Sequence, residues 1–99
     1  MVTDEVLIIV EVQDVLDEPI FASYRAQARQ QLLEHGGELL AQGGDLFEGS
    51  PAVGRSVLVQ RWPSEHAFRT WQASEAYAPL LRLRNKAARL RISIVPTVS

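Results

Sequence analysis

The stretch that decides the fold is Val6-Leu7-Ile8-Ile9-Val10, five apolar residues in succession. Four of the five are β-branched, a composition typical of β-strands, and we expect a strand over residues 5–12. A strand that is packed on one face alternates apolar and polar side chains, whereas an unbroken apolar run is typical of a strand buried on both faces. The run therefore predicts a first strand with both faces covered.

The rest of the chain contains further elements, which can be recognised from the periodic spacing of apolar residues and from the Gly, Pro and Ser residues at their ends. We expect a helix over residues 20–34, a strand over 38–48 interrupted at Gly43-Gly44, a loop over 49–54, a strand over 55–62, helical pieces over 65–72 and from about 74 to 89, and a last strand over 91–96. Pro19 suits the first turn of the first helix and Gly36-Gly37 its end. Ser64 and Ser74 are suitable N-caps for the two later helical pieces.

The order of these elements is β-α-β-β-α-β, which is that of the split βαβ, or ferredoxin-like, arrangement. The predicted fold class is therefore α+β: a four-stranded antiparallel sheet with two helical segments on one face. Ninety-nine residues suit one domain, so residues 1–99 are expected to form a single unit.

The helices of such a domain cover one face of the sheet, so the apolar strands need a second cover. The third expected strand also has an apolar centre, Val57-Leu58-Val59. Leaving several such side chains in water would forgo about 1.5–3 kcal/mol each. A second copy packed sheet to sheet is the simplest cover, which predicts a homodimer through the sheet face.

Composition removes several classes of function. Apolar residues make up 46% of the chain and charged residues 22%, as in globular domains. No apolar run reaches about 18 residues, and the acidic start Met1-Val2-Thr3-Asp4-Glu5 is unlike a signal peptide, so no membrane partner is expected. Without cysteine there is no disulfide framework or thiolate metal site, which agrees with a cytoplasmic location.

Although the net charge is only −2, the acidic and basic residues are unevenly distributed along the chain. Residues 1–54 hold two basic and ten acidic residues, whereas residues 55–99 hold eight basic and two acidic ones. The favoured explanation is that acidic and basic halves face each other within the domain or across a dimer. A site for an anionic small molecule is the alternative. Nucleic acid is disfavoured, because the chain is acidic overall and has no nucleic-acid-binding motif.

Arg84 is the unusual charged residue of the last helical stretch. At 100° per residue it shares a stripe with Tyr77 and Leu81, which sets a guanidinium on an apolar face. A buried arginine is unfavourable unless it is paired. Two interpretations stay open: an internal salt bridge to Glu11 or Glu48, or a snorkelling side chain, on the one hand, and a clamp for a ligand carboxylate on the other.

Two interpretations are also open for the aromatic residues Tyr24, Trp71 and Tyr77. Each is either a core aromatic whose polar atom finds one partner or a hydrogen-bond donor to a ligand. His35 stands at a helix end, where a histidine ordinarily caps carbonyl groups, and acid–base chemistry is the alternative. The candidate ligand-binding residues are therefore Tyr24, His35, Trp71, Tyr77 and Arg84, and no catalytic residue is assigned.

Metal and cofactor chemistry has little support in the sequence. His66 has no companion three or four residues further along its helix, so we interpret it as a surface residue and expect no metal site. Phosphate loops, nucleophile elbows, zincin motifs and dinucleotide fingerprints are all missing from the sequence, and no cofactor is expected.

A set of short motifs, each weak alone, is specific in its order and spacing. The motifs are Asp17-Glu18-Pro19 with Phe21 and Tyr24, His35-Gly36-Gly37, Glu48-Gly49, Trp62-Pro63-Ser64, Trp71 with Ser74-Glu75-Ala76-Tyr77, and Leu83-Arg84. In these motifs the chain resembles the DUF1330 family of small proteins of unknown function, within the dimeric α/β-barrel superfamily. The resemblance covers most of the chain and implies a dimer with a cleft between each sheet and its helices.

Three positions depart from the family pattern. The family often has a tyrosine where Phe21 stands, a phenylalanine where Trp62 stands and a glycine where Pro96-Thr97 stands. The first departure removes any role for a tyrosine hydroxyl at position 21.

The superfamily that the resemblance implies includes cofactor-independent quinol monooxygenases, haem-degrading enzymes and small-ring isomerases. The haem-degrading pattern combines an asparagine, a tryptophan and a helical histidine, and no histidine follows Trp71, so haem is disfavoured. Three functions stay open. The preferred one is binding of a small apolar or carboxylated metabolite in the cleft. The alternatives are a cofactor-independent monooxygenase- or isomerase-like enzyme and a purely structural dimer.

Overall fold

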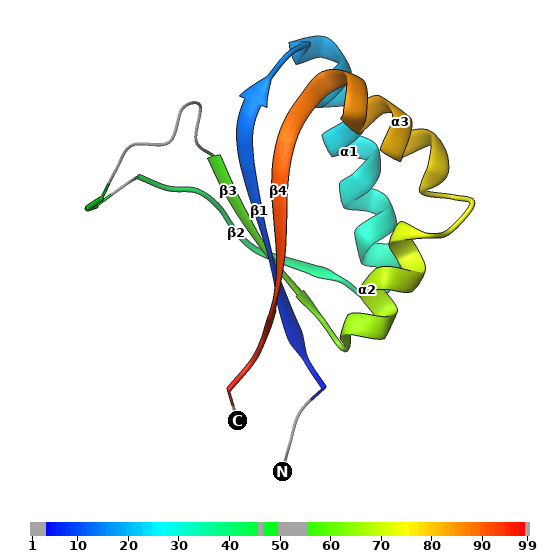
Figure 1. Cartoon of the computed structure of the whole chain (residues 1–99). Coiled ribbons are helices and arrows are strands. Elements are labelled where there is room, and N and C mark those ends of the chain that lie inside the picture. Colours follow the sequence, from blue (N-terminus) through cyan, green and yellow to red (C-terminus); the bar gives the residue numbers. More distant parts are fainter. Residues whose placement is uncertain (1–3, 46, 50–55, 99) are drawn as a thin grey trace.

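The computed structural model describes residues 4–45, 47–49 and 56–98. Its elements are β1 (Val6–Val15), α1 (Glu18–Glu34), β2 (Glu38–Gly43), β3 (Ser56–Trp62), α2 (Glu65–Gln72), α3 (Ala78–Ala87) and β4 (Ala88–Pro96) (Figure 1). The predicted βαββαβ order and α+β class are confirmed, with the second helical stretch divided into α2 and α3.

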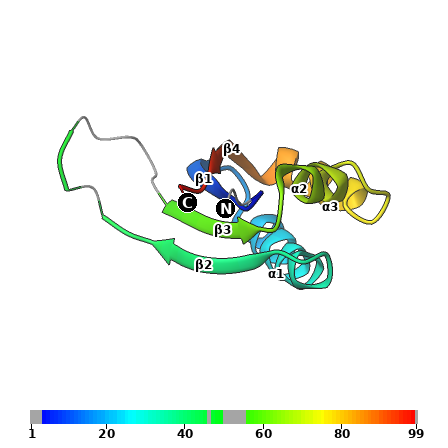
Figure 2. The same cartoon turned by 90° about the horizontal axis from the view of Figure 1, so that it is seen from below.

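The strands form one antiparallel sheet in the order β2-β3-β1-β4. β1 is central, and its Ile9 lies opposite Val59 of β3 and Ser93 of β4. All three helices lie on the same side of the sheet, with α1 beside β2, α2 beside β3 and α3 beside β4 (Figures 1 and 2). No helix of the described residues covers the opposite face.

The second predicted strand was too long. It ends at Gly43, and Asp45, Phe47 and Glu48 are not part of a strand, because Gly43 and Gly44 take φ angles of +94° and +98° that turn the chain out of the sheet. Apart from Gly49, the loop predicted over 49–54 lies outside the described residues, as does residue 55 at the predicted start of the third strand.

The boundary between the last helix and the last strand was also wrong. α3 ends at Ala87 instead of Arg89, and β4 begins at once with Ala88, whose φ and ψ of −157° and 160° are extended. The backbone N–H groups of Leu16 and Asp17 donate to the Ala87 carbonyl oxygen at 2.7 and 3.1 Å. A contact with the corner between β1 and α1 therefore replaces the next helical turn.

The start of α3 differs from the prediction in its cap. Tyr77, not Ser74, occupies the N-cap position. The Ser74 hydroxyl instead donates to the Trp71 carbonyl at 2.7 Å and accepts from the Tyr77 N–H at 3.2 Å, so it holds the turn between α2 and α3. The predicted Ser64 cap of α2 is confirmed, since its hydroxyl accepts from the Ala67 N–H.

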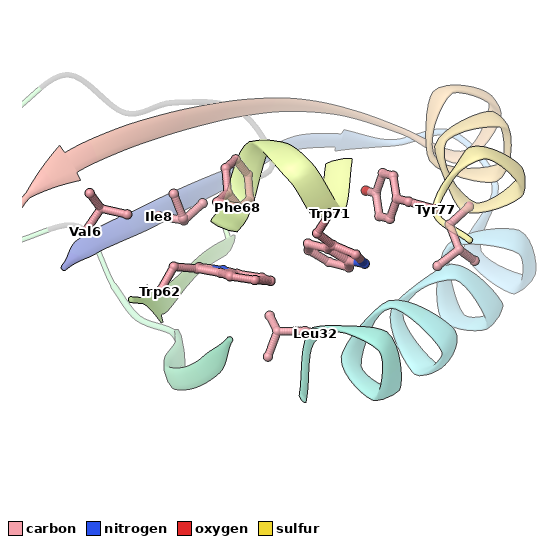
Figure 3. Close-up of a cluster of buried hydrophobic side chains, with 8 residues drawn as sticks. Val6, Ile8, Leu32, Trp62, Phe68, Trp71 and Tyr77 are labelled. Carbon is pink, nitrogen blue, oxygen red and sulfur yellow. The ribbon is translucent and has the colours of Figure 1, made fainter. Parts of the chain in front are cut away.

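The core between sheet and helices is aromatic (Figure 3). Trp62 and Trp71 stack with ring centroids 5.2 Å apart, and Tyr77 meets the edge of Trp71 at 4.7 Å. Phe68 packs edge-on against both indoles. Because Trp62 and Tyr77 are completely buried, this cluster fixes the positions of α2 and α3 on the sheet.

Gly37 allows the start of β2 to approach this cluster. A Cβ atom at this position would lie 2.6 Å from two ring atoms of Trp62 and 2.8 Å from Leu32 Cγ. Gly37 thus has a packing role beyond ending the first helix, whereas the φ of +96° at the neighbouring Gly36 is the feature that turns the chain.

We predict that Gly37→Ala destabilises the fold by about 1–3 kcal/mol, because the added methyl overlaps the Trp62 ring. Urea unfolding measures the effect. In a double-mutant cycle the same substitution in a Trp62→Phe background should be less destabilising, since the smaller ring leaves room. Equal destabilisation in both backgrounds would contradict the steric explanation.

Candidate functional site

A cavity of about 310 Å³ lies between the sheet and the helices. Its floor is formed by inward-facing strand residues, most of them apolar: Val10, Val12, Leu58, Leu90, Ile92 and Gln60. Its roof includes Phe21 and Tyr24 of α1, Trp71 of α2, Arg84 of α3 and Tyr77 just before α3. An adjoining hollow of about 320 Å³ shares Phe21, Arg25 and Gln42 with it, so the space continues along α1.

The structure brings four of the five predicted site residues together. Tyr24, Trp71, Tyr77 and Arg84 all line the cavity, although they come from α1, α2 and the region of α3. The Tyr24 and Tyr77 hydroxyl oxygens are 2.7 Å apart, and Arg84 Nη1 donates to the Tyr77 oxygen at 3.0 Å. These three side chains form one continuous hydrogen-bonded row across the roof.

Among the residues that the structure describes, no carboxylate pairs with Arg84. Its Nη1 donates to Gln72 Oε1 at 3.3 Å and to Tyr77, and its guanidinium carbon lies 5.9 Å from the Tyr77 ring centroid. The expected salt bridge to Glu11 or Glu48 is not formed. Glu11 lies between the inward-facing Val10 and Val12, so strand alternation places it on the opposite face of the sheet.

Trp71 is held by a residue that sequence reasoning missed. Its indole Nε1 donates to Gln31 Oε1 at 3.1 Å, and Gln31 Nε2 donates to the Ala76 carbonyl at 2.9 Å. Gln31 therefore straps α1 to the turn between α2 and α3. No sequence signal marks it, because glutamine is an ordinary helix-surface residue and α1 also carries Gln27 and Gln30.

His35 stands apart from the other candidates. It is exposed, its Nδ1 lies 2.7 Å from the Gln31 carbonyl oxygen, and its ring centroid is 6.2 Å from that of Trp71. It is not among the residues that line the cavity. His35 is therefore the C-cap residue of α1, and its ring lies near Trp71 outside the cavity. His66 is also exposed, as expected of a surface residue.

The charged residues that line the cavity are all basic. They are Arg25 and Arg29 on the exposed edge of α1 and the half-buried Arg84, and no Asp or Glu of the described residues lines the main cavity. Arg25 also lies over the Phe21 ring, 5.0 Å from its centroid. Arg25 and Arg29 are the two basic residues of the acidic half of the chain, so charge asymmetry was the signal that could have found them.

The Tyr24 hydroxyl resists ionisation. Burial raises its pKa above the ordinary value of 10, the neighbouring Tyr77 raises it further, and Arg84 acts in the opposite direction. At neutral pH Tyr24 therefore offers a neutral hydroxyl group. Among the residues that the structure describes, no three His, Asp or Glu side chains gather as a metal site would require. None of its helices is long and apolar enough to cross a membrane.

Comparison with known proteins identifies relatives of this chain. Residues 5–98 match a family described as a domain of unknown function, DUF1330. No curated protein matches. Among solved structures, RPA0582 of Rhodopseudomonas palustris, a protein of unknown function, superposes with a TM-score of 0.80 at 14% identity, over 97% of this chain and 85% of that one.

Two further structures share the fold at lower similarity. PA3566 of Pseudomonas aeruginosa has a TM-score of 0.64 at 16% identity, over 100% of this chain and 98% of that one. SnoaB of Streptomyces nogalater, a cofactor-independent oxygenase, has a TM-score of 0.61 at 16% identity, over 97% and 95%. At these identities the likeness shows the ferredoxin-like fold alone.

The raised pKa of Tyr24 predicts a loss of stability in alkali. The folded state keeps the Tyr24 proton above pH 10, where the unfolded state has lost it, so the free energy of unfolding falls as pH rises from 10. The slope is up to about 1.4 kcal/mol per pH unit. Urea unfolding between pH 9 and pH 11 should show a shallower fall for Tyr24→Phe than for the natural chain. Identical slopes would show that Tyr24 ionises normally.

Proposed function

The chain belongs to the DUF1330 family, and from this premise we propose that it binds a small organic molecule, with an apolar body and an acidic group, in the cavity between its sheet and its helices. The observation that carries the proposal is the state of Arg84. This guanidinium lies half-buried at an apolar cavity, and within the described residues its hydrogen bonds go to the neutral partners Gln72 and Tyr77, with the neutral Tyr24 hydroxyl also close enough to interact with it. A ligand anion would supply the missing opposite charge.

The energetic argument rests on desolvation. A guanidinium withdrawn from water without a counter-charge is unfavourable, and proteins usually pair it with a carboxylate. Arg84 has five N–H donors, and the hydrogen bonds of the structure use Nη1 alone. The N–H groups on Nε and Nη2 therefore stay available for a carboxylate or another oxyanion.

The remaining cavity wall suits the rest of such a ligand. Val10, Leu58 and Ile92 give an apolar floor, and the roof carries aromatic rings. A volume of about 310 Å³ is at the lower end of ordinary ligand pockets, which favours a small, compact molecule. Arg25 and Arg29 at the outer edge would attract an anion toward the opening.

A cofactor-independent oxygenase- or isomerase-like activity is the second candidate. It is favoured only by the fold shared with SnoaB, and fold does not determine chemistry. A purely structural dimer is the third candidate. It would leave the cavity and the free donors of Arg84 without a use, and for that reason we prefer ligand binding.

We further propose that the functional unit is a homodimer of single-domain subunits that pack through the sheet face opposite the helices. Leu7, Ile9, Val57 and Val59 of β1 and β3 alternate with the inward-facing residues and so form an apolar patch on that face. A second copy would bury this patch. The cytoplasmic location expected from the lack of cysteine stays a prediction.

The binding proposal predicts that purified protein carries or captures an organic anion. Native mass spectrometry of the fresh protein and thermal-shift screening of aromatic carboxylates are the measurements. A ligand at 100 times its dissociation constant should stabilise the fold by about 2.7 kcal/mol. Arg84→Met should remove this stabilisation, whereas Arg82→Met, an exposed residue of the same helix that does not line the cavity, should preserve it. Equal behaviour of the two variants would refute the role of Arg84.

The dimer proposal predicts that Ile9→Lys yields a folded monomer, because a lysine in the centre of the apolar patch would be desolvated on association. Light scattering at micromolar concentration reports the mass, and circular dichroism reports the fold. Leu33→Lys is the control, since Leu33 is 62% exposed on α1, away from the sheet face. A natural chain that is monomeric at this concentration would disprove the dimer.

A further inference from the structure

We propose that Tyr24, beside Arg84, also donates a hydrogen bond to the ligand, at the end of a one-way relay that runs from Arg84 through Tyr77. The ligand class that follows is a weak acid, a phenol or an enol, bound as its anion. This inference rests on the proposed binding function and adds to it the residue in contact and the protonation state of the ligand.

The direction of the relay follows from what each group can do. A guanidinium only donates, so the 3.0 Å contact makes the Tyr77 oxygen an acceptor from Arg84. Tyr77 is completely buried, and its own hydroxyl proton still needs a hydrogen-bond acceptor. Its remaining hydroxyl neighbour among the described residues is Tyr24, at 2.7 Å. Donation from Tyr77 to Tyr24 satisfies both groups.

The opposite direction leaves a buried proton without an acceptor. If Tyr24 donated to Tyr77, the Tyr77 oxygen would receive two hydrogen bonds and its own O–H would have no acceptor in the described structure. An unsatisfied buried donor is strongly disfavoured, and no other unsatisfied buried side-chain polar atom occurs in the described part of the chain. Polar satisfaction therefore selects the order Arg84, Tyr77, Tyr24.

This order leaves the Tyr24 proton for the cavity. Tyr24 lines the cavity and is half-buried, and its hydroxyl has Tyr77 as its hydrogen-bond partner. Accepting from Tyr77, which in turn accepts from a cation, polarises the Tyr24 O–H and strengthens its next hydrogen bond. Burial raises the pKa of Tyr24, which agrees with a hydroxyl that stays protonated and acts as a donor.

Among the described residues, the charged side chains that line the main cavity are all basic, which favours an anion. α1 contributes Arg25 and Arg29, and α3 contributes Arg84. α2 and the strands contribute uncharged polar side chains to the main cavity: Gln72, Gln42 and Gln60. Glu18 is the acidic residue, and it lines the adjoining hollow instead of the main cavity.

These surroundings act on the acidity of a bound weak acid. Polarised donors and cations stabilise the ionised ligand more than the neutral one, so the ligand should lose its proton more readily in the site than in water. A phenolate or enolate carries its charge mainly on oxygen, which a single Tyr24 donor can meet directly. A carboxylic acid is already ionised at neutral pH, so binding would change its ionisation state very little.

The test uses para-nitrophenol, whose phenolate absorbs visible light and whose phenol form does not. Binding is measured by quenching of tryptophan fluorescence, and ionisation of the bound probe is measured by visible absorbance across a pH titration. We expect the pKa of the probe to fall by about one unit on binding, which means that the phenolate binds about tenfold more tightly than the phenol. Para-nitroanisole, which cannot ionise, should bind at least tenfold more weakly than the phenolate.

Variants test the relay itself. Tyr24→Phe removes the final donor, and Tyr77→Phe breaks the relay while leaving Tyr24 in place, so each should reduce the preference for the phenolate several-fold. Arg82→Met is the matched control and should leave the preference unchanged. If Tyr77→Phe does not fold, Tyr24→Phe still decides, because this residue lies at the cavity wall. An unchanged preference in Tyr24→Phe would overturn the inference.

Two other outcomes separate this inference from the function on which it rests. If para-nitrophenol binds without a change in its pKa, or if para-nitrobenzoate binds and para-nitrophenol does not, the relay inference fails and anion binding stands. If none of the three probes and no aromatic carboxylate binds, both the relay and the proposed function fail.

Discussion

The hydrogen bond between the Tyr24 and Tyr77 hydroxyl groups is the contact on which the roof of the cavity depends. It joins α1 to the start of α3, and Gln31 makes a second polar link between α1 and the turn before α3. Both links are made by polar side chains of α1, so they fix α1 against α3 and the turn before it, and the cavity lies between these elements and the sheet.

Much of the fold could be predicted because its signals are local. The apolar run of β1, the spacing of Phe21 and Tyr24 on α1 and the stop at Gly36-Gly37 are each readable within a few residues. The errors came from tertiary contacts. The end of α3 is set by two N–H groups that precede α1, 71 and 70 residues earlier in the chain, and local helix propensity does not indicate such a long-range hydrogen bond.

The candidate site likewise contains residues that the sequence predicted and residues that it did not. The helical stripe singled out Arg84, and the aromatic candidates were correctly placed near it. Its partners were not predictable, since Gln72 and Gln31 become meaningful only when α2 and α1 are placed against α3. The expected pairing of Arg84 with Glu11 was avoidable, however. Val10 and Val12 face the helices, and alternation alone puts Glu11 on the other side of the sheet.

An apolar run indicates that its side chains are shielded from water, but it does not indicate which part of the molecule shields them. In β1 the inward row that contains Ile8 is covered by the aromatic cluster, whereas Val10 and Val12 in the same row floor a cavity. The outward row that contains Ile9 has no cover within the described chain. The hydrophobic pattern is the same in all three situations, so it cannot distinguish a packed core from a cavity wall or from a sheet face that the described chain leaves uncovered. Under the proposed function, charge is what sets the ligand site apart: Arg84 lies beside apolar walls, and its hydrogen bonds within the described residues go to neutral partners.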